Sequence, residues 1–98
     1  MLFRSRRLAD LITEDAARLA EIESTDNGKL IAEMRGQLNY VPQWYHYFGG
    51  LSDKIEGSVI PIDKPGVFNF TRREPLGVIA AIVAWNSPLL LEIGRAHV

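Results

Sequence analysis

Apolar and polar positions alternate with a helical period in the first quarter of the chain. Along it, apolar residues recur at steps of three and four, at Leu8, Leu11, Ile12, Ala16, Leu19 and Ile22. Charged residues fill the opposite side, at Asp10, Glu14, Asp15, Arg18 and Glu21. This pattern predicts an amphipathic helix over residues 5–23. The turn sequence Asp26-Asn27-Gly28 is expected to end it.

Two further helices are expected before the middle of the chain. A short one covers residues 29–35 and is weakened by Gly36, and another begins at Pro42 and runs to residue 54, because proline suits the first turn of a helix. The second carries a broad set of apolar and aromatic side chains, at Trp44, Tyr45, Tyr47, Phe48 and Leu51. Core or subunit packing is the favoured role of these rings over ligand stacking. His46 has no second ligand at metal spacing, so no metal site is expected.

A change of period then predicts β structure. The turn sequence 63–66 lies between two candidate strands, residues 59–62 and 67–71. This arrangement predicts a β-hairpin over residues 57–73, with Pro61 at an edge. Residues 77–84 are apolar on both faces, as is typical of a strand covered on both sides in a parallel α/β sheet. One such strand cannot form a sheet alone, so the sequence is expected to be the front part of a larger α/β protein.

The apolar run 77–84 ends on Trp85 and Asn86. Burying an amide without hydrogen bonds costs about 1–3 kcal/mol. Asn86 at the end of such a run is therefore either a satisfied turn residue or a working hydrogen-bond donor.

Composition narrows the function classes. The 98 residues carry a formal net charge of −1, which gives no reason to expect nucleic acid or an anionic membrane as a partner. The longest apolar run, residues 75–91, is shorter than a membrane span of roughly 20 residues and is interrupted by polar residues and proline. A soluble, cytoplasmic protein is expected. The absence of cysteine excludes a disulfide, a thiolate metal site and a cysteine nucleophile within these residues.

Four segments together resemble one known family. Arg73-Glu74-Pro75-Leu76-Gly77-Val78 and Trp85-Asn86-Ser87-Pro88-Leu89 are similar to a paired pattern of the aldehyde dehydrogenase superfamily. Asp26-Asn27-Gly28-Lys29 and the segment 47–57 resemble two further family signatures. The segments occur in the family's order and spacing, and the resemblance covers residues 8–91.

The resemblance implies a fold class and a domain organisation. The fold would be α/β, with N-terminal helices, an oligomerisation-type β-hairpin and the first strand of a Rossmann-like parallel-sheet cofactor domain. Residues 1–91 would be a partial NAD(P)-binding domain that includes the hairpin 57–73. The partners implied are an aldehyde substrate and further copies of the protein, the latter through residues 57–73.

The resemblance also implies an activity, which is oxidation of an aldehyde to a carboxylic acid with NAD or NADP. In the family a cysteine thiolate attacks the carbonyl, and the resulting oxyanion is held by a backbone N–H and an asparagine amide. Asn86 matches that asparagine. The residues that would line the cofactor cleft are Ile82, Val83, Ala84, Trp85 and Asn86; plain core packing is an equal alternative for Ile82 and Val83.

The chain departs from the family pattern in ways that limit the function. Ala84 stands where many members have proline, and Ser87 stands where phenylalanine is common. Without a cysteine, this chain cannot run the covalent mechanism alone. Two alternatives therefore stay open: a non-catalytic interaction or oligomerisation module, and an inactive structural relative.

Residues 92–98 do not continue the family pattern and resemble a translated sequencing adapter, so they are expected to be a non-native tail. The isolated chain is expected to fold poorly or aggregate, because nothing in it covers the apolar run 78–83.

Overall fold

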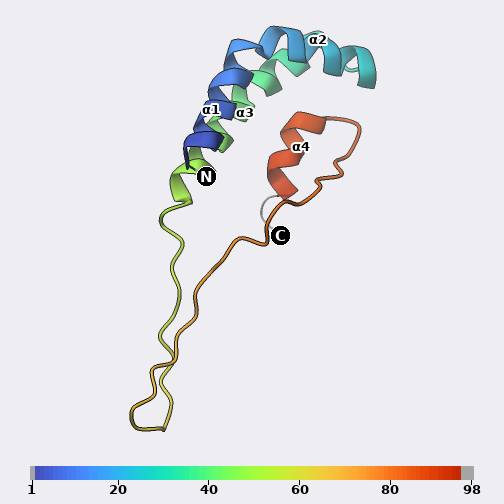
Figure 1. The fold of residues 1–98 in the computed structure, drawn as a ribbon. Coiled ribbons are helices and arrows are strands. Elements are labelled where there is room, and N and C mark those ends of the chain that lie inside the picture. The colour runs from blue at the N-terminus through green and yellow to red at the C-terminus, as the bar shows by residue number, and fades with distance from the viewer. Residues whose placement is uncertain (1, 96–98) are drawn as a thin grey trace.

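The computed structural model describes residues 2–95, and this part of the chain contains four helices (Figure 1). They are α1 (Leu2–Glu14), α2 (Ala16–Asn27), α3 (Ile31–Leu51) and α4 (Pro88–Arg95). Helices α1 and α2 run one after the other along α3, and α4 returns to pack against α3 after a long excursion of the chain.

The helix predicted over residues 5–23 is confirmed as helical but is divided at Asp15. Backbone bonds from Asp15 N to Leu11 O (3.1 Å) and from Leu19 N to Asp15 O (3.0 Å) carry the chain through the break. The Asp15 carboxylate accepts hydrogen bonds from the Arg18 guanidinium, which hold the pKa of Asp15 below its ordinary value. The predicted stop is confirmed: α2 ends at Asn27, and Gly28 takes the left-handed conformation (φ 75°) that glycine adopts without strain.

The prediction of two separate helices over residues 29–35 and 42–54 was wrong, because α3 is a single helix with Pro42 inside it. Proline removes one backbone hydrogen bond and costs a helix interior about 3 kcal/mol. Three side chains of α3, those of Met34, Leu38 and Val41, are fully buried. Each contributes about 1.5–3 kcal/mol on burial, so packing outweighs the loss at Pro42.

The core lies where the helices meet. It consists of fully or nearly fully buried side chains from α1, α2 and α3, namely Ile12, Ala20, Met34, Leu38 and Val41. Leu89 and Leu90 of α4 pack against it from the other end of the sequence. The core therefore fixes the start of α4, which lies two residues after Asn86.

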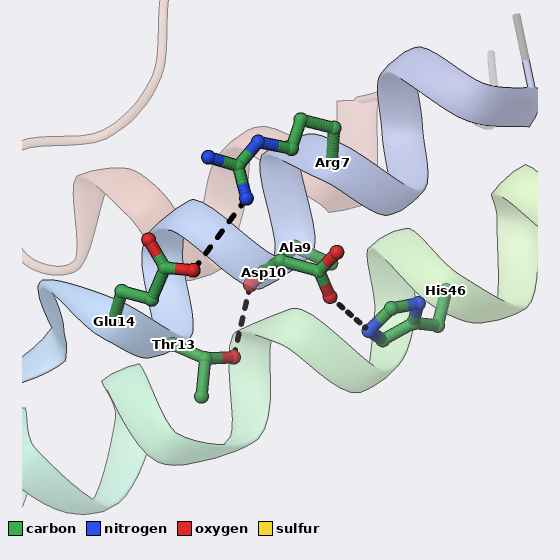
Figure 2. A network of polar contacts seen from close by, with 6 residues as sticks. All are labelled: Arg7, Ala9, Asp10, Thr13, Glu14 and His46. Atoms are coloured by element: carbon green, nitrogen blue, oxygen red, sulfur yellow. Dashed lines mark hydrogen bonds and ion pairs between the residues drawn. The ribbon is translucent and has the colours of Figure 1, made fainter.

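A polar contact joins α1 to α3 at the edge of this core (Figure 2). His46 Nε2 of α3 lies 3.6 Å from Asp10 Oδ1 of α1. On α1 itself, the Thr13 hydroxyl donates to Ala9 O (2.9 Å), and Arg7 reaches Glu14 at 3.5 Å. Within residues 2–95 no three His, Cys, Asp or Glu side chains gather as metal ligands would.

The predicted α/β fold class is wrong for the described part of the chain. Residues 2–95 form no strand and no sheet, so neither the hairpin 57–73 nor the strand 77–84 of a Rossmann-like sheet is present. One isolated antiparallel bridge pairs Val59 with Phe70. Two strands alone are marginal in water, and residues 77–84 have no neighbouring strand in residues 2–95 with which to pair.

The stretch between α3 and α4, here called the arm (residues 55–84), extends away from the helices and turns back on itself (Figure 1). The molecule measures 64 × 24 × 19 Å with a radius of gyration of 18.7 Å. A compact chain of this length has a radius of gyration of about 13 Å. The arm therefore exposes its apolar side chains instead of burying them. Among the helices of residues 2–95, none is both long enough and apolar enough to cross a membrane.

Candidate functional site

The five predicted site residues lie where the chain passes from the arm to α4: three end the arm, and Trp85 and Asn86 follow it. Ile82 and Trp85 are 83% and 73% exposed, and Ala84 is exposed as well. Val83 and Asn86 are half-buried. The structure thus brings them together only as neighbours in sequence, and within residues 2–95 nothing covers the Ile82 or Trp85 side chain.

Asn86 combines a fixed backbone with an uncommitted side chain. Its carbonyl oxygen accepts hydrogen bonds from the Ser87 hydroxyl (2.5 Å) and from Asn27 Nδ2 (3.5 Å). Within residues 2–95 its side-chain amide makes no hydrogen bond. The backbone of Asn86 is therefore held in a turn by hydrogen bonds, and its side-chain amide remains available as a donor.

Ser87 occupies the N-cap position of α4. Its carbonyl accepts the first helical bond, from Leu91 N at 2.9 Å, and the residue is only 3% exposed. Its hydroxyl does not cap the helix in the usual way. It donates to Asn86 O and accepts from Lys29 Nζ at 3.1 Å.

The cap of α4 comes instead from Glu23 on α2. Glu23 Oε1 accepts a hydrogen bond from Leu89 N (2.8 Å), although 66 residues separate the two. A carboxylate at this end of a helix also interacts favourably with the helix dipole. Glu23 is 5% exposed, and its Oε2 is buried without a hydrogen-bond partner in the described part of the chain.

The loop between α2 and α3 holds Asn27 and Lys29 in place. Asn27 Oδ1 accepts from Lys29 N (2.8 Å), and Asn27 Nδ2 also approaches Met34 Sδ at 3.5 Å. The Ser24 hydroxyl donates to Lys29 O (2.7 Å). Together Glu23, Asn27, Lys29 and Ser87 fasten the turn at Asn86 to the helices, and this set is called the anchor below.

Sequence reasoning proposed Asn86 as a site residue, which stays a prediction, and did not predict that Glu23 and Lys29 would hold the turn that contains it. A signal was present for Glu23, because it follows Ala20 by three residues and so falls on the face of α2 that enters the core. A carboxylate on an apolar face is rarely buried without a partner. Its partner lies far away in sequence, which periodicity cannot reveal.

Comparison with known proteins decides the family. The aldehyde dehydrogenase family model matches residues 4–97, almost the whole chain. This chain belongs to the aldehyde dehydrogenase family. The resemblance seen in the motifs is thereby confirmed.

Individual members of the family support the assignment. A (Z)-2-((N-methylformamido)methylene)-5-hydroxybutyrolactone dehydrogenase of Acinetobacter baylyi is 55% identical over 85 residues, which is 87% of this chain and 17% of that protein. A hydroxyisobutyraldehyde dehydrogenase of Mycolicibacterium austroafricanum is 46% identical, over 88% of this chain and 17% of its own length. A mitochondrial aldehyde dehydrogenase of Homo sapiens is 44% identical with the same coverage.

This chain therefore spans about 17% of the length of the curated relatives it matches.

Residues 92–95 continue α4, with Ile93 buried and the Tyr45 hydroxyl 3.3 Å from Glu92 Oε2. Residues 96–98 of the predicted non-native tail lie outside the described residues. The foreign origin of residues 92–98 stays a prediction.

Proposed function

We propose that this chain is an N-terminal part of an NAD(P)-dependent enzyme that oxidises an aldehyde to a carboxylic acid, and that Asn86 is one of its oxyanion donors. Family membership supports the reaction class. The observation that carries the residue assignment is the state of Asn86: its backbone is held by two hydrogen bonds, and its side-chain amide has none within residues 2–95. A donor prepared for a transition state has this form.

The proposed chemistry explains why an amide stands at this position. When a thiolate adds to an aldehyde carbon, the carbonyl oxygen gains negative charge as its double bond becomes a single bond. The Asn86 N–H groups would donate to that oxygen without losing a proton themselves, because an amide does not titrate. The thiolate must come from outside this chain, which has no cysteine.

The residues beside Asn86 fit one wall of a dinucleotide site. Trp85 and Ile82 present broad apolar surface that is exposed in the described part of the chain, as a wall contacting a nicotinamide ring requires. The bound cofactor would accept the hydride that leaves the substrate. The groups that hold the phosphates and ribose of the cofactor would have to come from residues beyond this segment. Those residues would also decide between NAD and NADP.

A second candidate function is a module for binding further copies of the protein through residues 57–73. It is favoured by the exposed rings of Phe68 and Phe70, whose centroids lie 5.4 Å apart on the arm. Exposed apolar patches of this kind mark contact surfaces. This role is compatible with the enzyme but does not need it.

The deciding experiment uses the full-length protein that carries this segment. Aldehyde-dependent reduction of NAD and NADP is followed at 340 nm, and Asn86→Ala is compared with Asn39→Ala on exposed α3 surface. Loss of one oxyanion donor lowers the acylation rate by about 100- to 1,000-fold. Cofactor affinity should change far less.

Two outcomes would count against the proposal. Equal losses of acylation rate and cofactor affinity would mean that Asn86 is structural. A full-length protein that assembles into oligomers but oxidises no aldehyde in a broad panel would favour the second candidate.

A further inference from the structure

We infer that Glu23 and Lys29 are positioning residues for Asn86: through the anchor they fix the backbone turn from which its side-chain amide projects. The inference rests on the proposed function of Asn86 as an oxyanion donor. Neither residue touches the proposed reacting atoms. Lys29 Nζ instead donates to the Ser87 hydroxyl just before α4, and Glu23 Oε1 accepts from Leu89 N within the first turn of α4.

The first step concerns the orientation of the peptide plane between Asn86 and Ser87. Its carbonyl oxygen is bound from two sides, by Asn27 Nδ2 and by the Ser87 hydroxyl. Lys29 Nζ in turn binds the oxygen of that hydroxyl at 3.1 Å. Because the lone pairs of Ser87 Oγ are engaged by a cation, its proton is directed to Asn86 O, and rotation of the plane is opposed.

The second step concerns which side chain caps the N-terminus of α4, Ser87 or Glu23. Serine is among the best N-cap residues and would serve α4 alone. Here the Leu89 N–H is bound by Glu23 Oε1 at 2.8 Å, which leaves the Ser87 hydroxyl free for Asn86 O. Thus Glu23 allows Ser87 to act on Asn86.

The third step is the burial of Glu23. A cap made by Ser87 would need no buried charge, whereas Glu23 is 5% exposed with Oε2 unpartnered among the described residues. Burying such a group costs stability. The arrangement is therefore a poor solution for stabilising α4 alone and a good one for holding the turn before it.

The test compares matched variants of the full-length protein. Glu23→Met removes the acceptor while keeping the length of the side chain, and Glu23→Gln keeps an oxygen that can accept from Leu89 N–H. Glu21→Met, on an exposed position of the same helix, is the control. Each is also combined with Asn86→Ala. Circular dichroism and thermal melting check that every variant folds.

A misplaced catalytic group costs up to about 100-fold in rate. We expect Glu23→Met to lower the single-turnover acylation rate about 10- to 100-fold, with cofactor affinity unchanged. Glu23→Gln and Glu21→Met should stay within about threefold of the wild type. In the Asn86→Ala background, Glu23→Met should cost less than about threefold more, because the group it positions is already absent.

Additive losses in the double variant would overturn the inference, since they would show that Glu23 acts independently of Asn86. So would a parallel loss of cofactor affinity. If Glu23→Met does not fold, Lys29→Met is read by the same criteria, with Lys29→Arg as its conservative partner. A wild-type protein that oxidises no aldehyde would instead overturn the proposed function itself, whereas an active enzyme insensitive to both substitutions would overturn the inference alone.

Discussion

The exposed arm predicts that the isolated 98-residue chain self-associates. The most exposed large apolar side chains of the arm are those of Leu76, Val78 and Ile82, and Val78 is completely exposed. Full burial of such a side chain contributes about 1.5–3 kcal/mol. We therefore expect the arms of neighbouring molecules to bury these side chains against one another.

The perturbation is a triple variant, Leu76→Glu, Val78→Glu and Ile82→Glu. Removing three such contacts forfeits about 5 kcal/mol at the low end of the range, which is more than about a thousandfold in Kd. The general cost of association is common to both proteins and largely cancels in the comparison. The variant should therefore stay monomeric at concentrations at which the wild-type chain assembles.

The assay is sedimentation velocity with light scattering over a concentration series. The control adds the same three negative charges without removing apolar surface, at exposed helical positions, as Thr25→Glu, Asn39→Glu and Gln43→Glu. This control should associate like the wild type. A wild-type chain that is a monodisperse monomer with a cooperative thermal transition would refute the reasoning.

Three further outcomes are expected in the monomeric triple variant. Leu38→Ala, at a fully buried core position, should lower the free energy of unfolding by about 2–5 kcal/mol in urea titrations. The Thr71 N–H donates to Ser58 O (2.8 Å), which should protect it from hydrogen exchange. Gly57→Ala should abolish that protection, because a Cβ on Gly57 would lie 1.9 Å from Thr71 O and force the two segments apart. Burial and then the neighbouring Glu92 raise the pKa of Tyr45 to about 12, so its neutral form is favoured in the folded state. Stability should consequently fall as pH rises from about 10 towards 12, and the tyrosine ionisation step near pH 12, followed by absorbance at 295 nm, should be absent in Tyr45→Phe.

Local patterns predicted the helical half of the fold well and its details less well. The period of α1 and the left-handed stop at Gly28 both follow from nearby residues, and both are confirmed. Ile22, expected on the apolar face, is half exposed, while Glu23 beside it is buried. The helix is divided at Asp15, so the buried face of α2 does not continue the period of α1.

The β half was predicted wrongly because strands depend on partners. The apolar character of residues 77–84 is real, but a strand forms only when another backbone pairs with it, and none does within residues 2–95. Pro42 was misread for the opposite reason: burial of its neighbours in α3 holds the helix together despite the missing hydrogen bond. In both cases tertiary contacts, present or missing, overrode the local signal.

The long-range cap on α4 has a consequence for the order of events during synthesis. Glu23 and Leu89 are separated by 66 residues. At a translation rate of about 5–20 residues per second, Leu89 is added to the chain about 3–13 s after Glu23. Helices α1, α2 and α3 are thus synthesised before the Asn86 turn, and they provide the surface against which the later segment packs. A ribosome that pauses while it translates the arm would prolong the period in which the Glu23 carboxylate lacks its hydrogen bond from Leu89.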